Sequence, residues 1–176
     1  MKTIDKYLFQ AMDNYPYWLE GTIESLDYAL SYNDKNPMVL GLYGRIQAEQ
    51  LQDYEEAKRY YEEALAIDIH AVALYPYYLD ALLLNEDYDE AEKLITFALT
   101  IKGIAKVAIL LRQVVLLERK QDLKGAIKLL KEVKLASYDN DSYEIEAVEK
   151  RLKAKKELLK PKSSNKKKKD KKGKKK

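Results

Sequence analysis

Apolar residues recur at helical spacing through most of the chain. Within the stretch 51–68, Tyr54, Ala57, Tyr61 and Ala64 follow one another at intervals of three, four and three residues. This spacing places them on one side of an α-helix with 3.6 residues per turn. The residues between them are mostly charged and would face water. Because large and small residues alternate along the stripe, a second helix can approach closely at the alanines. The pattern predicts an amphipathic helix that packs against a neighbour.

The same pattern returns 34 residues later, in the stretch 85–102. Seven of the eighteen aligned positions are identical, and the second stripe consists of Tyr88, Ala91, Ile95 and Ala98. A weaker third copy follows with Leu123, Ala126, Leu130 and Val133. A single helix pair cannot bury its own apolar stripe, so a repeated pair predicts a stack with a continuous core.

Helix-breaking and helix-capping residues divide the chain into nine predicted helices. The first eight form four antiparallel pairs, near residues 3–14, 16–32, 37–51, 54–67, 71–84, 88–101, 104–119 and 122–136. The ninth begins with Asp141 as N-cap and ends before Pro161. Its apolar side carries Ile145, Val148, Leu152 and Leu159, and its other side is charged. A stacked array of helices needs a terminal helix with a polar outer side, which covers the apolar surface of the last pair and faces water.

The intervals of aromatic and alanine residues, together with the period of 34, resemble the tetratricopeptide repeat. The resemblance implies an all-α, right-handed solenoid over residues 1–160. Its repeat units would be approximately 3–36, 37–69, 70–103 and 104–136, and 141–160 would be the capping helix. In that family the first helices of the units line a concave side where partners bind.

The resemblance implies a peptide-binding groove drawn from the first helices. Its residues would be Val39, Leu42, Ile46, Gln50, Ala73, Asp80, Leu83, Ala108, Leu111, Val115 and Arg119. Such an apolar groove with a few charges at its edge suits an extended or helical peptide. Periodicity does not separate groove from core, so the same residues are equally compatible with packing against the next unit.

Two aromatic clusters echo each other, YPYWLEG at 15–21 and YPYYLDA at 75–81. In each, a proline fits the first turn of a helix. Tyrosine and tryptophan contribute strongly to binding energy at interfaces. The clusters are therefore candidate anchors, with packing between helix pairs as the alternative, and comprise Tyr15, Tyr17, Trp18, Tyr75, Tyr77 and Tyr78.

Charge is distributed unevenly along the chain. The whole protein has a formal net charge of +3, but residues 160–176 hold eleven lysines and one aspartate. The remainder has 21 basic and 28 acidic residues, a net charge of −7. The segment 161–176 has no apolar anchor and is predicted to be disordered. Its candidate anion-binding residues are Lys166, Lys167, Lys168, Lys169, Lys171, Lys172, Lys174, Lys175 and Lys176.

Lysines alone contact nucleic-acid phosphates, anionic lipid head groups or acidic proteins without sequence specificity. No arginine or aromatic residue accompanies them in the tail. Base readout and base stacking are therefore not expected. A purely solubilising tail, or one that folds back on the acidic body, is the alternative.

The sequence contains none of the common catalytic motifs. The chain has no cysteine and a single histidine, His70, without a second metal ligand or a nucleophile nearby in sequence. It has no phosphate-binding glycine loop. Neither a secretion signal nor an apolar run of membrane-spanning length is apparent. We expect a cytoplasmic protein that is not an enzyme and needs no cofactor or metal.

These observations lead to two hypotheses of function. The first is a protein- or peptide-binding adaptor or scaffold whose groove holds the partner, with the basic tail attaching to something anionic. The second is a nucleic-acid- or ribosome-associated factor in which the tail makes the main contact. Partner identity and oligomeric state are left open.

Overall fold

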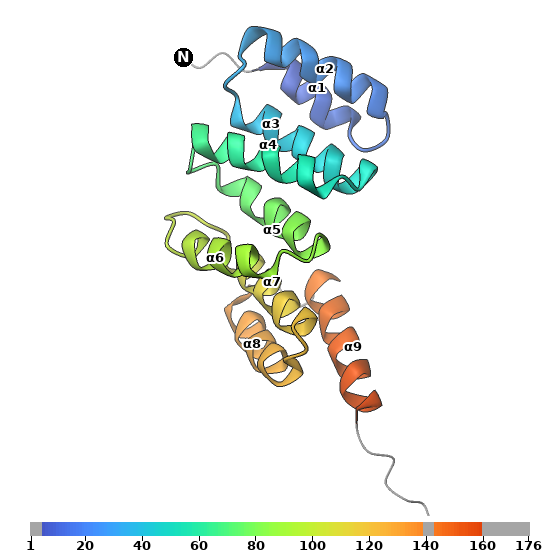
Figure 1. The fold of residues 1–176 in the computed structure, drawn as a ribbon, viewed down its shortest axis with the longest axis vertical. Coiled ribbons are helices and arrows are strands. Elements are labelled where there is room, and N and C mark those ends of the chain that lie inside the picture. Colours follow the sequence, from blue (N-terminus) through green and yellow to red (C-terminus); the bar gives the residue numbers. More distant parts are fainter. Residues whose placement is uncertain (1–4, 139–142, 160–176) are drawn as a thin grey trace, which may run out of the picture.

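The computed structural model describes residues 5–138 and 143–159, and this part of the chain consists of helices joined by short turns and loops, with no strand. Figure 1 shows the helices stacked along the long axis. In chain order they are α1 (Lys6–Asn14), α2 (Leu19–Tyr32), α3 (Pro37–Arg45), the π-helical η1 (Ile46–Leu51), α4 (Tyr54–Ile67), the 3₁₀ turn η2 (Val72–Leu74), α5 (Tyr75–Leu84), α6 (Tyr88–Ala98), α7 (Lys106–Arg119), α8 (Leu123–Ala136) and α9 (Tyr143–Leu158).

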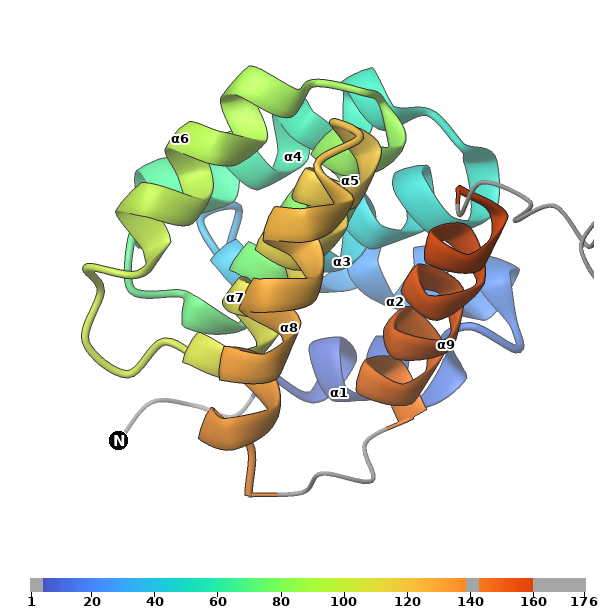
Figure 2. The ribbon, with the colours of Figure 1, turned by 90° about the horizontal axis from the view of Figure 1, so that it is seen from below.

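Each helix packs against its neighbours in the chain. The helices pair as α1 with α2, α3 with α4, α5 with α6, and α7 with α8, and α9 packs against α8. Helices that come first in their pairs also touch across pairs, α1 with α3 and α5 with α7. Seen along the long axis, α6 and α9 lie on opposite sides of the α7/α8 pair (Figure 2). The predicted all-α architecture with neighbouring helices in contact is confirmed.

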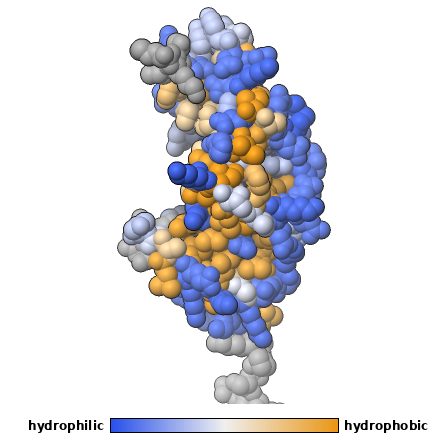
Figure 3. Space-filling view, turned by 90° about the vertical axis from the view of Figure 1, so that its left-hand side faces the viewer, coloured by the Kyte–Doolittle hydropathy of each residue, from blue (hydrophilic) through white to orange (hydrophobic). Residues whose placement is uncertain are grey.

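The core is built from the predicted stripes. Ala57, Tyr61 and Ala64 of α4 are buried, as are the equivalent residues Ala91, Ile95 and Ala98 of α6 and Ala126, Leu130 and Val133 of α8. The stack leaves other apolar surface uncovered. In the side view of Figure 3, hydrophobic surface gathers in a band down the middle, whereas hydrophilic surface covers the right-hand flank.

One turn geometry recurs at the repeat spacing. Gln52, Glu86 and Gln121 have φ angles of 57°, 65° and 67°, and each precedes an aspartate that begins the next helix. In two of these turns the aspartate side chain accepts a helix N–H, at 3.1 Å for Asp53 to Glu56 and 2.9 Å for Asp122 to Gly125. These are N-caps, which satisfy orphan donors of the first turn. Asp53 and Asp122, which the sequence predicted as helix boundaries, are therefore the N-cap residues of α4 and α8.

Several helix bounds differ from the prediction. Helix α2 begins at Leu19 rather than at 16, and Pro16 lies before the helix in a cis peptide with Tyr15. Helix α5 begins at Tyr75 rather than at 71, so Pro76 does fall in its first turn. The helix predicted over 37–51 changes to a π-helix at Ile46. Leu159 lies past α9 and is exposed. The predicted cap Asp141 and the lysine tail lie outside the described residues.

Gly44 sets the distance between α3 and α4. A Cβ at this position would lie 2.9 Å from Cζ and 3.0 Å from Cε1 of the buried Tyr61 ring. We expect Gly44→Ala to destabilise the protein by about 1–3 kcal/mol, because overpacking exceeds the roughly 1 kcal/mol gained in helix propensity. Urea denaturation monitored by helical circular dichroism measures this. A stability equal to or above that of the parent protein would contradict the close approach.

Candidate functional site

A row of polar and aromatic side chains crosses the first helices of the pairs. The hydroxyl of Tyr15, after α1, donates to Oε2 of Glu49 at 2.6 Å. Glu49 also accepts from Nε of Arg45 at 3.0 Å and from its Nη2 at 3.2 Å. The Arg45 guanidinium lies 4.8 Å from the ring centroid of Tyr15 and 4.2 Å from that of Tyr77 in α5. Cation–π contacts and hydrogen bonds thus join three successive helix pairs.

A second set of contacts continues the row. Arg112 of α7 donates from Nε and Nη2 to the two carboxylate oxygens of Asp80 in α5, at 3.0 and 2.8 Å. Its Nη1 donates to Oε2 of Glu144 in α9 at 3.1 Å. Bidentate pairing of this kind fixes the orientation of both groups. We call the whole set the inner row; it comprises Tyr15, Arg45, Glu49, Tyr77, Asp80, Arg112 and Glu144.

The carboxylates are the more exposed members of the inner row. The side chains of Glu49, Asp80 and Glu144 are 39, 44 and 58% exposed, whereas those of Arg45 and Arg112 are 28 and 11% exposed. Both guanidinium groups already donate to carboxylates. The hydrogen-bonding capacity that the inner row still offers to solvent therefore consists mainly of carboxylate oxygens, which are acceptors. Such a surface can accept hydrogen bonds from peptide N–H groups or from cationic side chains.

The phenol of Tyr15 is a fixed donor in this arrangement. Burial, followed by its hydrogen bond to Glu49, raises its pKa to about 12. Deprotonation would place a phenolate beside a carboxylate in a partly buried site. Tyr15 therefore stays neutral and keeps the Glu49 carboxylate oriented at any physiological pH.

An open hollow of about 690 Å³ lies between α6, α7 and α9, separate from the residues of the inner row. It is lined by Glu86, Tyr88, Val115, Glu118, Arg119, Gln121, Arg151 and Lys155. Its buried member is Glu118, whose side chain is 2% exposed. Arg151 donates to Glu118 from Nε at 2.8 Å and from Nη2 at 2.7 Å, and Nζ of Lys155 lies 2.8 Å away. These contacts tie α9 to α7.

The electrostatics of Glu118 follow from this pairing. Burial by itself would raise the pKa of its carboxyl, but the hydrogen bonds from Arg151 and Lys155 lower it below the usual value of 4.5. The carboxylate is therefore ionised in the folded protein at neutral pH. Glu118 acts as an electrostatic anchor for α9 rather than as a proton donor.

The predicted groove divides into core and surface. Five of its residues are buried and pack in the core: Val39, Leu42, Ile46, Leu83 and Leu111. Asp80, Ala108 and Val115 are half-buried, and Gln50, Ala73 and Arg119 are exposed. Because Leu42 and Leu111 are 5 and 3% exposed, a charge at either position would destabilise the core instead of blocking a surface. The five buried residues are corrected to packing residues.

The two aromatic clusters occupy different environments despite their similar sequences. Tyr75 and Tyr78 are buried, and Tyr78 stacks on Tyr61 at 5.4 Å between ring centroids. Tyr17 is 94% exposed and Trp18 is 56% exposed. Tyr15 and Tyr77 belong to the inner row. Packing therefore accounts for Tyr75 and Tyr78, and also for Tyr15, which is 8% exposed and donates its hydroxyl to Glu49. Tyr77 is half-buried, and only Tyr17 and Trp18 are largely exposed.

Sequence reasoning missed the arginines of the inner row. Its long-range hydrogen bonds join residues about one repeat apart, with separations of 34 for Tyr15 to Glu49 and 32 for Asp80 to Arg112. The available signal was therefore a pair of complementary polar side chains about one repeat apart, such as Asp80 and Arg112. Reading each helix by itself for apolar stripes conceals such pairs, because the polar side of a helix appears to face water.

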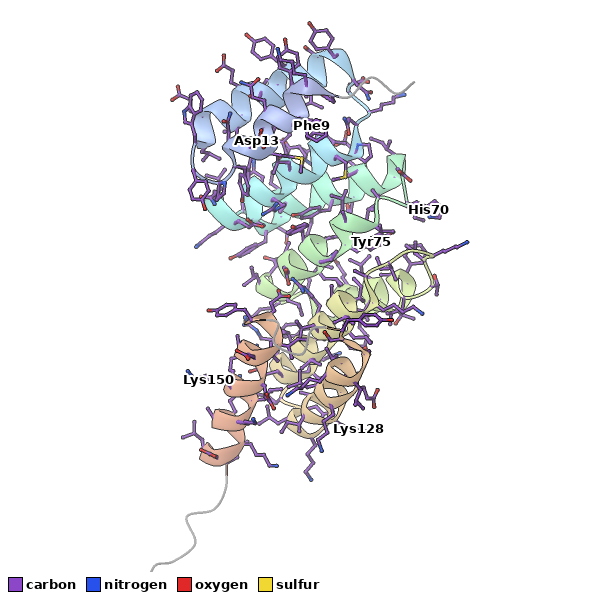
Figure 4. All side chains as sticks on the ribbon, turned by 180° about the vertical axis from the view of Figure 1, so that it is seen from behind. Phe9, Asp13, His70, Tyr75, Lys128 and Lys150 are labelled. Atoms are coloured by element: carbon purple, nitrogen blue, oxygen red, sulfur yellow. The ribbon has the colours of Figure 1, made fainter. Side chains whose placement is uncertain are left out.

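Neither His70 nor the acidic residues form a metal site in the part of the chain that the structure describes, where no group of three potential ligands occurs. His70 is exposed at the edge of the molecule, after α4 (Figure 4). Over residues 5–138 and 143–159, no helix has the length and apolar character needed to cross a membrane.

No protein-family model matches the chain, and comparisons with curated proteins and with solved structures gave no significant match.

Proposed function

We propose that the chain is a non-catalytic binding module that holds a protein or peptide segment against the inner row. The observation that carries this proposal is the row itself, in which hydrogen bonds and cation–π contacts join side chains of successive helix pairs and of α9. Preorganised side chains lose little conformational freedom on binding, which favours affinity. A surface of this length suits an extended or helical segment better than a small molecule.

The proposal includes a tetratricopeptide-like, right-handed solenoid as the scaffold. The 34-residue repetition, the buried alanine and aromatic stripes and the recurrent left-handed turn residues support it. In such an array the first helices of the pairs share one side of the stack. That arrangement accounts for contacts between residues one repeat apart.

The chemistry of the row indicates the kind of partner. Exposed oxygens of Glu49, Asp80 and Glu144 favour a segment that offers N–H groups, amides or a basic side chain. The ring of Tyr77 and the exposed Leu84 at the end of α5 add apolar area. Aromatic and aliphatic anchors of this type supply much of the energy at interfaces. In this proposal the module acts in the cytoplasm, and the lysine tail adds electrostatic attraction to an anionic surface.

Two positions on α5, the half-buried Tyr77 and the exposed Leu84, provide the test. We expect Tyr77→Ala with Leu84→Lys to reduce capture of partner from cell extract at least tenfold, because it removes a ring and an apolar contact from the row. The matched control, Tyr28→Ala with Ile23→Lys, changes exposed residues of the same types on α2. Quantitative mass spectrometry of both variants, after nuclease treatment, measures the difference. Equal capture by the two variants would reject the inner row as the binding surface.

A further inference from the structure

The second helices of the four pairs, α2, α4, α6 and α8, expose the same side. Their fourth residues are all fully buried and are, in chain order, Thr22, Ala57, Ala91 and Ala126. Their second, sixth and ninth residues are all exposed. Because these positions are four and three residues apart, they lie in one line along the helix, about 10 Å long at a rise of about 1.5 Å per residue. We call this line the outer line of each helix.

The charge of the outer line changes from one end of the stack to the other. The line consists of Glu20, Glu24 and Asp27 in α2, of Glu55, Arg59 and Glu62 in α4, of Asp89, Lys93 and Thr96 in α6, and of Lys124, Lys128 and Lys131 in α8. The two middle helices mix the signs. The two end helices, each of 14 residues, carry opposite charges at identical positions. Helices α2 and α8 therefore present lines of equal length, equal spacing and opposite charge.

The acidic line of α2 has no cation near it in sequence. Residues 7–34 contain five acidic and no basic residues. In the part of the chain that the structure describes, Glu20 and Glu24 form no ion pair, and Asp27 accepts a hydrogen bond from the neutral hydroxyl of Tyr43. The α2 line therefore presents uncompensated negative charge to solvent.

The lysines of the α8 line are likewise without an ion pair among the described residues. The one acid of α8, Glu132, lies beside the line and pairs with none of its lysines, whereas Lys134, off the line, pairs with Glu149 of α9 at 3.1 Å. Like charges at these spacings destabilise a helix, and Lys124 in the first turn opposes the helix dipole. Local rules broken without local compensation are expected where a surface has a binding role.

The two charged lines cannot neutralise each other within one molecule. Helix α2 lies at one end of the stack and α8 lies towards the other, with the helices of the middle pairs between them (Figure 1). Figure 4 shows Lys128 projecting away from the body. Two copies of the chain, in contrast, can bring opposite lines together. Complementary charge steers such an encounter and fixes its register.

We propose that the outer line of α2 in one copy of the chain binds the outer line of α8 in a second copy. A second copy is favoured over an unrelated partner because both members of the complementary pair occur on this chain, at identical helix positions. Apolar contact is available at the same end of both helices, where Tyr32 of α2 and Leu135 of α8 are 77 and 88% exposed.

The contact joins two different surfaces, so it is heterologous. Each added copy offers a further α2 and a further α8, and the expected product is a head-to-tail assembly. Exposed ion pairs are individually weak, so the association is reversible and sensitive to salt. This proposal concerns a surface other than the inner row and stands or falls separately from it.

Sedimentation equilibrium of the full chain tests for the assembly, over protein concentrations of roughly 10 µM to 1 mM. At about 0.05 M salt, the weight-average mass should rise with concentration above the monomer mass of 20.5 kDa. At about 1 M salt, where the Debye length is about 3 Å, the mass should return to that of the monomer. A monomer mass at every concentration in low salt would overturn the proposal.

Charge reversal at the first two positions of each line tests which surfaces meet. Glu20→Lys with Glu24→Lys, or Lys124→Glu with Lys128→Glu, should each weaken the association at least about tenfold in low salt, because like charges then face each other. Asp27 is left unchanged, since it accepts the hydrogen bond from Tyr43.

Two control variants make the same changes of net charge elsewhere. Glu146→Lys with Glu157→Lys alters exposed residues of α9, and Lys93→Glu with Lys102→Glu alters exposed residues of α6 and of the loop after it. Both controls should associate nearly as the parent chain does. Equal weakening in a control and in the matching line variant would show that only net charge matters, and would overturn the proposal.

The decisive variant combines both reversals in one chain. It keeps the parent net charge of +3 and exchanges the signs of the two lines at the changed positions, so it should associate again in low salt. Its recovery would also exclude unfolding as the cause of the losses in the double variants. A combined variant that stays monomeric would overturn the proposal. So would a loss that follows reversal of α2 but not of α8, because another basic segment would then occupy the α2 line.

Discussion

Tyr61→Ala should lower the free energy of unfolding by about 3–5 kcal/mol. The Tyr61 ring is 1% exposed, lies against Gly44 and stacks on Tyr78. Its removal leaves a cavity between two helix pairs that rigid neighbouring backbone cannot fill. Chemical denaturation monitored by circular dichroism measures the loss.

The control for this substitution is Tyr17→Ala, since the Tyr17 side chain is 94% exposed. That change should stay within about 0.5 kcal/mol of the parent protein. Comparable losses at the two positions would show that Tyr61 is not part of a close-packed core. A loss of stability in the Tyr61 variant alone would support the conclusion that the buried apolar stripe of α4 stabilises the fold.

Arg151→Met combined with Lys155→Met should destabilise the protein by about 3 kcal/mol, because it leaves Glu118 charged and buried without a partner. Breaking a buried ion pair typically costs about 3–5 kcal/mol. We expect a loss near the lower value, because Arg151 and Lys155 are about half-exposed and solvent screens part of their charge. A third change, Glu118→Gln, removes the buried charge and should recover most of the loss. Denaturant titrations of the double and triple variants measure both steps.

The same site has a defined pH dependence. The pKa of Glu118 is lower in the folded protein than its usual 4.5, so the folded state favours the carboxylate. Its stabilising contribution is then fully present above the unfolded pKa and is lost as pH falls through the folded pKa. The parent protein should therefore lose more stability than the triple variant on acidification below about pH 4.5. An identical acid response would contradict the anchoring role of Glu118.

Much of the helical order was predictable because it depends on local pattern. The stripes through Ala57, Ala91 and Ala126 repeat at nearly constant spacing, and aspartates at the boundaries cap the helices that follow. These features involve residues within one or two turns. The local sequence therefore contains the information needed to place the helices.

The assignment of core and surface was less predictable. Each first helix packs on more than one neighbour, so Leu42 is buried in a cluster with residues of α1 and α2, and Leu111 in a cluster with residues of α8 and α9. The tripeptide Tyr-Pro-Tyr shows a similar limit. At Pro76 it begins a helix, whereas at Pro16 it lies in the turn before one. Tertiary surroundings that differ between the two places decide the outcome.

The inner row and the Glu118 anchor depend on separations of about 32 to 34 residues. A charged residue within the apolar helix α7, such as Arg112 or Glu118, looks like an exposed position when that helix is considered alone. Only the stacking of α5, α7 and α9 brings the opposite charges together. Long-range electrostatic pairing of this type follows from the fold and not from helical periodicity.

The most direct measurement of the central claim is hydrogen–deuterium exchange of the full chain with and without its captured partner. The account predicts slower exchange on binding in α5 and in the adjoining segments of α3 and α7, which carry Tyr77, Arg45 and Arg112. Helices α2 and α4, which carry no residue of the inner row, should be unchanged. Protection confined to α8 and the tail, with none in α5, would contradict the inner row as the site where the partner binds.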